Sequence, residues 1–122
     1  MPDVLLIDDS PVQLHVREAV LRSAGFSVLT ATSAEQAIKL LHDEAVSSGL
    51  RVIVTDHVLP GARGDSFVRE LRSLRHTVPV VVVTGMHDAE PEYAGLEIIF
   101  LHKPCPPEHL ILRIRQAIDR VA

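Results

Sequence analysis

The sequence has a single cysteine, Cys105, and no apolar run long enough to cross a membrane. One cysteine cannot form an internal disulfide, so the chain fits a reducing compartment. A membrane helix needs about 18 or more apolar residues in succession. The polar pair Asp8 and Asp9 follows the start of the chain too closely for a signal peptide. These absences predict a cytoplasmic protein without a membrane segment.

Positive charge is also scarce, because 12 Lys and Arg residues stand against 16 Asp and Glu residues, for a formal net charge of −4. A nucleic-acid-binding domain usually carries a basic patch, so this balance argues against a nucleic acid as the partner. The length of 122 residues is enough for one hydrophobic core, and a composition of 47% hydrophobic and 23% charged residues is ordinary for a globular protein. We therefore expect one domain over residues 1–122.

Five short apolar runs recur along the chain and predict five β-strands. They are VLLI (4–7), VLTA (28–31), VIVT (52–55), VPVVVVT (78–84) and EIIFL (97–101). Helix-sized segments separate them, and this alternation is typical of βαβ units around a parallel sheet. The continuous apolar character of the first, third and fourth runs indicates strands covered on both faces. The predicted fold class is α/β, a doubly wound (βα)5 three-layer sandwich.

Capping signals and apolar spacing predict helices that begin near Ser10, Ser33, Gly64 and Pro107. The second helix has a capping box of Ser33 and Gln36, and its apolar stripe continues to Ala45. Residues 85–95 contain Pro91 and Gly95 and have room for only a turn or two of helix. We therefore expect the helix between the last two strands to be short.

Polar residues stand where the predicted strands end. Asp8 and Asp9 follow the first strand, Asp56 the third, Thr84 closes the fourth, and Lys103 comes after the fifth. The carboxyl ends of parallel strands share one edge of the sheet, so these side chains should lie together. Three converging carboxylates repel each other unless a cation joins them. Mg²⁺ accepts such oxygen ligands, together with phosphate oxygens.

This set of residues suits reversible phosphorylation of one aspartate. An aspartate can act as a nucleophile and form an aspartyl-phosphate. Lys103 can neutralise a phosphoryl group as a point charge, and the Thr84 hydroxyl can donate a hydrogen bond to it. Metal, cation and hydroxyl together would stabilise the equatorial oxygens during transfer.

Four motifs, LLIDDS, VIVTDHVLPG, VVVVTG and LHKP, resemble in their order and intervals the receiver domain of two-component response regulators. The resemblance covers the whole chain and implies the CheY-like (flavodoxin-like) sheet order 2-1-3-4-5. It implies that Asp56 accepts a phosphoryl group from the phosphohistidine of a sensor histidine kinase or a histidine phosphotransfer protein. Mg²⁺ is the implied cofactor. The domain then switches conformation to signal to a downstream effector or output domain.

The resemblance also implies a role for each motif residue. The phosphoacceptor is Asp56. The groups that hold the metal are Asp8, Asp9, Asp56 and the backbone carbonyl of Val58. The switch and phosphoryl-binding residues are Thr84, Lys103 and Phe100, and the residues that shape the loops are Pro60, Gly61, Gly85 and Pro104. Such a domain is not an enzyme in the usual sense, because it catalyses only its own phosphorylation and slow self-dephosphorylation.

The sequence departs from the family pattern in two places. Residues 85–102 are fewer than we expect there, so a homodimer through the face of the short helix is left open rather than assumed. Val58 and Met86, two positions after Asp56 and Thr84, are both apolar. Because no polar side chain would orient the attacking water, we expect slow self-dephosphorylation.

Other interpretations of the same residues are less specific. Asp8 and Asp9 could cap a helix, Thr84 is an ordinary β-former, and Lys103 with its proline could be a simple loop. The seven histidines lack zinc-ligand spacing, and most are expected at the surface. His57, next to Asp56, is close enough to tune the site, but it is expected to be a variable loop residue. Cys105 is expected to act as a small apolar residue.

Three other classes of protein fit the residues less well. A receiver that works without phosphorylation would lack an acidic residue or the lysine. A phosphohydrolase with an aspartate nucleophile would carry a second aspartate at position 58, where this chain has valine, and a cap domain. A flavin-binding domain would not place the negative charge of DDSP beside a phosphate. The residues after Lys103 suffice for one helix, so we expect a stand-alone receiver or a receiver excised from a longer protein.

Overall fold

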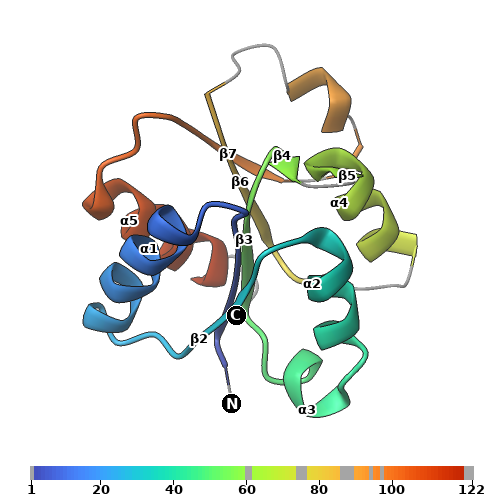
Figure 1. The fold of residues 1–122 in the computed structure, drawn as a ribbon, viewed down its shortest axis with the longest axis horizontal. Helices are drawn as coiled ribbons and strands as arrows, with labels where there is room; N and C mark the ends of the chain where they lie inside the picture. Colours follow the sequence, from blue (N-terminus) through green and yellow to red (C-terminus); the bar gives the residue numbers. More distant parts are fainter. Residues whose placement is uncertain are drawn as a thin grey trace.

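A five-stranded parallel sheet forms the centre of the fold and confirms the predicted α/β class (Figure 1). The computed structural model describes residues 2–59, 62–73, 77–85, 90–93, 95–96 and 98–119. The sheet strands are β1 (Val4–Ile7), β2 (Val28–Ala31), β3 (Val52–Asp56), β6 (Val80–Thr84) and β7 (Ile99–His102). They lie in the order β2-β1-β3-β6-β7. When the five strands of this sheet are numbered along the chain, the order is the predicted 2-1-3-4-5.

Helices cover both faces of the sheet. One face carries α1 (Pro11–Ser23) and α5 (Pro107–Asp119), and the other carries α2 (Ala34–Leu41), α3 (Glu44–Ser47) and α4 (Gly64–Ser73) (Figure 1). Within the described part of the chain, none of these helices has the length and hydropathy needed to cross a bilayer.

The helices begin where their capping residues predict. The Ser10 hydroxyl accepts a hydrogen bond from the Gln13 N–H at 3.4 Å, and Ser33 accepts one from the Gln36 N–H at 3.1 Å. These bonds satisfy N–H groups that lack a partner within a helix. Gly25 ends α1 with a φ of +97°, a conformation that glycine adopts without a steric penalty.

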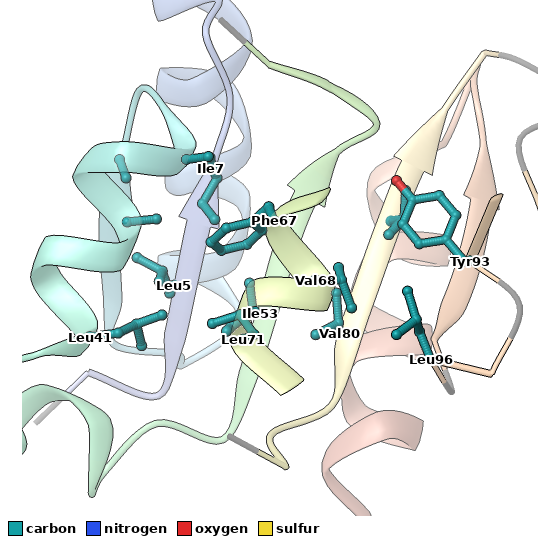
Figure 2. Close-up of a cluster of buried hydrophobic side chains, with 14 residues drawn as sticks. Leu5, Ile7, Leu41, Ile53, Phe67, Val68, Leu71, Val80, Tyr93 and Leu96 are labelled. Carbon is teal, nitrogen blue, oxygen red and sulfur yellow. The ribbon is translucent and has the colours of Figure 1, made fainter. Parts of the chain in front are cut away.

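Each face of the sheet has its own core. In β1, Leu5 and Ile7 contribute to the core beneath α2 and α4, whereas Val4 and Leu6 contribute to the core beneath α1 and α5. All four side chains are fully buried. Figure 2 shows the first core, where Phe67 from α4 lies over the sheet. Burial of a large apolar side chain stabilises a fold by about 1.5–3 kcal/mol, so the two cores hold the strand ends in place.

Two local features differ from the expectations. The predicted stripe through Ala45 is wrong: α2 ends at Leu41, and the Asp43 carboxylate caps the separate helix α3 by accepting from the Ala45 N–H at 3.0 Å. Ala45 is exposed as a result. In addition, β4 (Val58–Leu59) and β5 (Ala62–Arg63) pair as a short antiparallel ladder that was not predicted.

Among the described residues between β6 and β7, helical structure is short, as predicted. Its described residues contain one 3₁₀ turn, η1 (Glu90–Tyr93). Pro60, Gly61 and Met86 lie outside the described residues.

Candidate functional site

The register of the sheet brings Asp8 beside Asp56. In the β1–β3 ladder Ile7 pairs with Thr55, so the residues that follow each of them stand at the same level. Both carboxylates therefore lie at the carboxyl edge of the sheet, between two central strands. This is the juxtaposition that the sequence predicts.

The next two strands add the other predicted groups. Asp56 pairs with Val83, the residue before Thr84, and Thr84 pairs with His102, the residue before Lys103. The Lys103 N–H donates to the Thr84 carbonyl at 2.8 Å, which continues the β6–β7 pairing by one residue. Thr84 is buried, and Lys103 is partly exposed.

Three carboxylates form a compact cluster at this edge. One oxygen from each of Asp8, Asp9 and Asp56 lies within 4.8 Å of the other two. Asp8 is 1% exposed and Asp56 is 5% exposed, whereas Asp9 is open to solvent. Hard oxygen donors at this separation, with one side open for water, fit the ligand requirements of Mg²⁺.

Electrostatics favour a cation in the cluster. Burial raises the pKa of Asp8 above its ordinary value, and the hydrogen bond and negative charge of Asp56 raise it further. The Ser10 N–H, 2.9 Å from Asp8 Oδ1, and the charge of Arg17 act in the opposite direction without reversing the shift. Ionised Asp8 is therefore held at a cost that a divalent cation would relieve.

Two basic side chains reach the carboxylates. Lys103 Nζ lies 3.3 Å from Asp56 Oδ1. Arg17 Nη1 lies 2.9 Å from Asp8 Oδ2 and 3.3 Å from the same Asp56 Oδ1. Sequence reasoning did not single out Arg17. A signal was present, because Arg17 is spaced with the buried Leu14 and Leu21 along one face of α1.

Other predicted site residues, Val58, Gly85 and Pro104, follow the ends of β3, β6 and β7. Gly85 is exposed, and a Cβ built on it would meet no heavy atom within 4 Å beyond its chain neighbours, so this flank is open. The peptide bond between Lys103 and Pro104 is cis. Val58 lies in β4, two residues after Asp56, and only its backbone is described.

The neighbours of Phe100 and His57 tie η1 to the site. Phe100 is half-buried and meets the Tyr93 ring edge-on, with 5.2 Å between centroids. His57 lies at a bend between β3 and β4, in the loop predicted for it, and its side chain is 2% exposed. His57 Nδ1 lies 2.7 Å from the Tyr93 hydroxyl, and Nε2 lies 3.0 Å from a Glu92 carboxylate oxygen. Sequence reasoning also missed Tyr93, although it is the only tyrosine.

Known proteins share this sequence pattern. The family model of the response regulator receiver domain matches residues 4–115. The transcriptional regulatory protein AruR of Pseudomonas aeruginosa is 35% identical over 125 residues, which are 99% of this chain and 51% of AruR. The hydrogenase transcriptional regulatory protein HoxA of Cupriavidus necator is 34% identical, over 95% of this chain and 24% of HoxA. The chain thus spans about half or less of these curated relatives.

Solved structures share the fold over their full length. A response regulator receiver domain protein from Clostridium thermocellum superposes with a TM-score of 0.89 at 26% identity, over 99% of this chain and 97% of that one. The chemotaxis response regulator CheY4 of Vibrio cholerae gives 0.82 at 26% identity, over 96% and 98%. Sequence match, sheet order and the acidic edge agree, and the chain belongs to the receiver domain family of two-component response regulators.

Proposed function

We propose that the domain accepts a phosphoryl group on Asp56 in a Mg²⁺-dependent reaction. The observation that carries the proposal is the cluster of Asp8, Asp9 and Asp56, with Lys103 Nζ on the Asp56 carboxylate. The phosphoryl donor is the phosphohistidine of a histidine kinase or of a histidine phosphotransfer protein. An Asp56 oxygen attacks the phosphorus, the new P–O bond forms, and the P–N bond breaks to release the imidazole.

The residues around Asp56 have separate roles in the proposed phosphoryl transfer. Asp8, Asp9, Asp56 and the Val58 carbonyl would hold Mg²⁺, which when bound neutralises charge on the phosphoryl oxygens. Lys103, directly after β7, supplies a positive charge to Asp56. Thr84 offers a hydroxyl, and exposed Gly85 leaves the approach open for the donor.

The phosphorylated domain signals rather than turning over a substrate. Its reactions are its own phosphorylation and a slow loss of the phosphoryl group, in the cytoplasm. AruR and HoxA are named as transcriptional regulatory proteins, and the chain spans only part of each. By this likeness, the phosphorylated domain signals to an output domain or to a separate effector protein.

Mass spectrometry after incubation with acetyl phosphate tests the proposal. We expect one added phosphoryl group in the presence of Mg²⁺, none after chelation with EDTA, and none in Asp56→Asn. Asp119→Asn, which removes an exposed aspartate from α5, is the matched control and should still be modified. Modification that does not need Mg²⁺, or that survives in Asp56→Asn, would overturn the proposal.

A further inference from the structure

Arg17 occupies a position where a charge needs a specific partner. Its neighbours along the same face of α1, Leu14 and Leu21, are both buried, and the Arg17 side chain is itself only 16% exposed. A guanidinium held this close to an apolar core is costly unless it is paired. Nη1 carries two N–H groups, enough to donate one to Asp8 and one to Asp56.

The pairing engages the two buried carboxylates of the site. Asp56 Oδ1 faces both Arg17 Nη1 and Lys103 Nζ at 3.3 Å, and Asp8 Oδ2 faces Arg17 at 2.9 Å. Two positive charges thus stand against the three carboxylates of the cluster. A divalent cation that binds the same oxygens would have to replace the contacts of Arg17.

We infer that Arg17 is an internal counter-cation that competes with Mg²⁺ for Asp8 and Asp56. The inference rests on the proposed Mg²⁺ site. In the metal-free domain Arg17 screens the carboxylates from each other and stabilises the fold. When Mg²⁺ enters, the guanidinium leaves them, so the affinity for Mg²⁺ is lower than the carboxylates alone would give.

Space for this movement lies beside the side chain. Arg17 lines a cavity of about 300 Å³ between α1 and α5, together with Val16, Val20 and Leu110. Val12 also lines the cavity and is 73% exposed, so the cavity opens to solvent. The guanidinium can therefore turn toward water while its methylene stem stays in apolar contact, without repacking of α1.

Isothermal titration calorimetry with Mg²⁺, on the unphosphorylated domain, tests the inference. Arg17→Gln should bind Mg²⁺ about tenfold more tightly than the wild type, because the competing charge-assisted hydrogen bonds are gone. Thermal unfolding in EDTA should show a lower melting temperature for Arg17→Gln, and saturating Mg²⁺ should narrow that difference. The sign is diagnostic, since a residue that merely positions Asp8 would weaken Mg²⁺ binding when removed.

Arg51→Gln is the matched control. It removes the same charge from an exposed position next to the first residue of β3, at the opposite end of that strand from Asp56. Its Mg²⁺ affinity should equal that of the wild type, and equal tightening in this variant would overturn the inference in favour of a long-range charge effect. If Arg17→Gln does not fold, Arg17→Lys, which keeps the charge on a shorter side chain, should bind Mg²⁺ more tightly than the wild type.

Two other outcomes separate the inference from the proposed function. Equal affinities for the wild type and both Arg17 variants would overturn the inference and leave the Mg²⁺ site intact. Absence of Mg²⁺ binding in all variants would overturn both.

Discussion

Asp8 is a buried carboxylate whose ionised form is disfavoured by burial and by the adjacent Asp56. Burial and the adjacent Asp56 carboxyl raise its pKa above the ordinary value of 3.8, although Arg17 and the Ser10 N–H oppose the shift. Folding therefore binds protons at Asp8, and the fold loses stability as the pH rises above 3.8. The metal-free domain carries this cost at neutral pH because the same carboxylate is needed at the site.

Asp8→Asn should stabilise the metal-free domain at neutral pH. The amide oxygen can still accept from the Ser10 N–H, whereas the like charge facing Asp56 is removed. We expect the melting temperature to rise by a few degrees, the shift that about 1 kcal/mol gives a domain of this size. Urea unfolding in EDTA from about pH 3.5 to about pH 7.5 should show the gain fading toward the acid end.

The control for this pH series is Asp119→Asn, at an exposed position on α5. It should leave stability unchanged within about 0.5 kcal/mol at every pH. A loss of stability in Asp8→Asn at neutral pH would contradict the conclusion that ionised Asp8 destabilises the metal-free fold.

The lifetime of the phosphoryl group depends on two other residues, Val58 and Met86, neither of which has a polar side chain. We expect Val58→Asn and Met86→Glu to shorten the half-life of the phosphorylated domain, because a polar group there can orient the attacking water. The measurement is decay of the phosphorylated mass after removal of acetyl phosphate. Val46→Asn, on α3, is the matched control for a new asparagine. A wild-type half-life no longer than those of the variants would refute the expectation.

At the scale of elements, side chains join η1 to the sheet. Tyr93 is 3% exposed, and its hydroxyl lies 2.7 Å from Nδ1 of His57, the residue after Asp56. Its ring also contacts Phe100 of β7. A change at Asp56 therefore has a short, buried connection to the segment that precedes β7.

A double-mutant cycle on Tyr93 and His57 tests this connection. Tyr93→Phe should cost about 1 kcal/mol in the free energy of unfolding, because it removes one partner of a buried hydrogen bond. In the double variant Tyr93→Phe/His57→Leu the total loss should be smaller than the sum of the two single losses, by about 0.5 kcal/mol or more. Urea unfolding of all four proteins gives the coupling.

Ile118→Val, from the core on the opposite face of the sheet, provides the comparison for that cycle. Combined with Tyr93→Phe it should be additive within about 0.5 kcal/mol. Additive losses for Tyr93 and His57 as well would show that the contact does not couple η1 to β3.

At the scale of the whole molecule, the parallel sheet explains why residues from four separate stretches form one site. The central strands β1, β3 and β6 are buried between two cores, so their register is fixed and the last residue of each arrives at a fixed level. The functional groups then stand at the carboxyl ends of the strands, where Asp8, Asp56 and Thr84 are buried and Asp9 and Lys103 are exposed. Loss of either core would displace the site as a whole.

Local features of the sequence are enough to predict the strands, their polar ends and most of the site. Apolar runs of strand length and the turns after them are local features, and a parallel sheet brings Asp8, Asp56, Thr84 and Lys103 to one edge. The predicted short helix before β7 was confirmed, and so was the sheet order, which the resemblance to receiver domains implied. The break between α2 and α3 was missed because a single capping aspartate, Asp43, outweighed the apolar stripe.

The packing of distant elements, in contrast, sets which other side chains meet the carboxylates. Helical spacing places Arg17 on the inner face of α1, but its reach to both Asp8 and Asp56 depends on how closely α1 packs on the sheet. His57 is buried because η1 folds over it, 36 residues farther along the chain. Such contacts join elements that are distant in sequence. Their distances are set by the packing of the cores, which local periodicity does not encode.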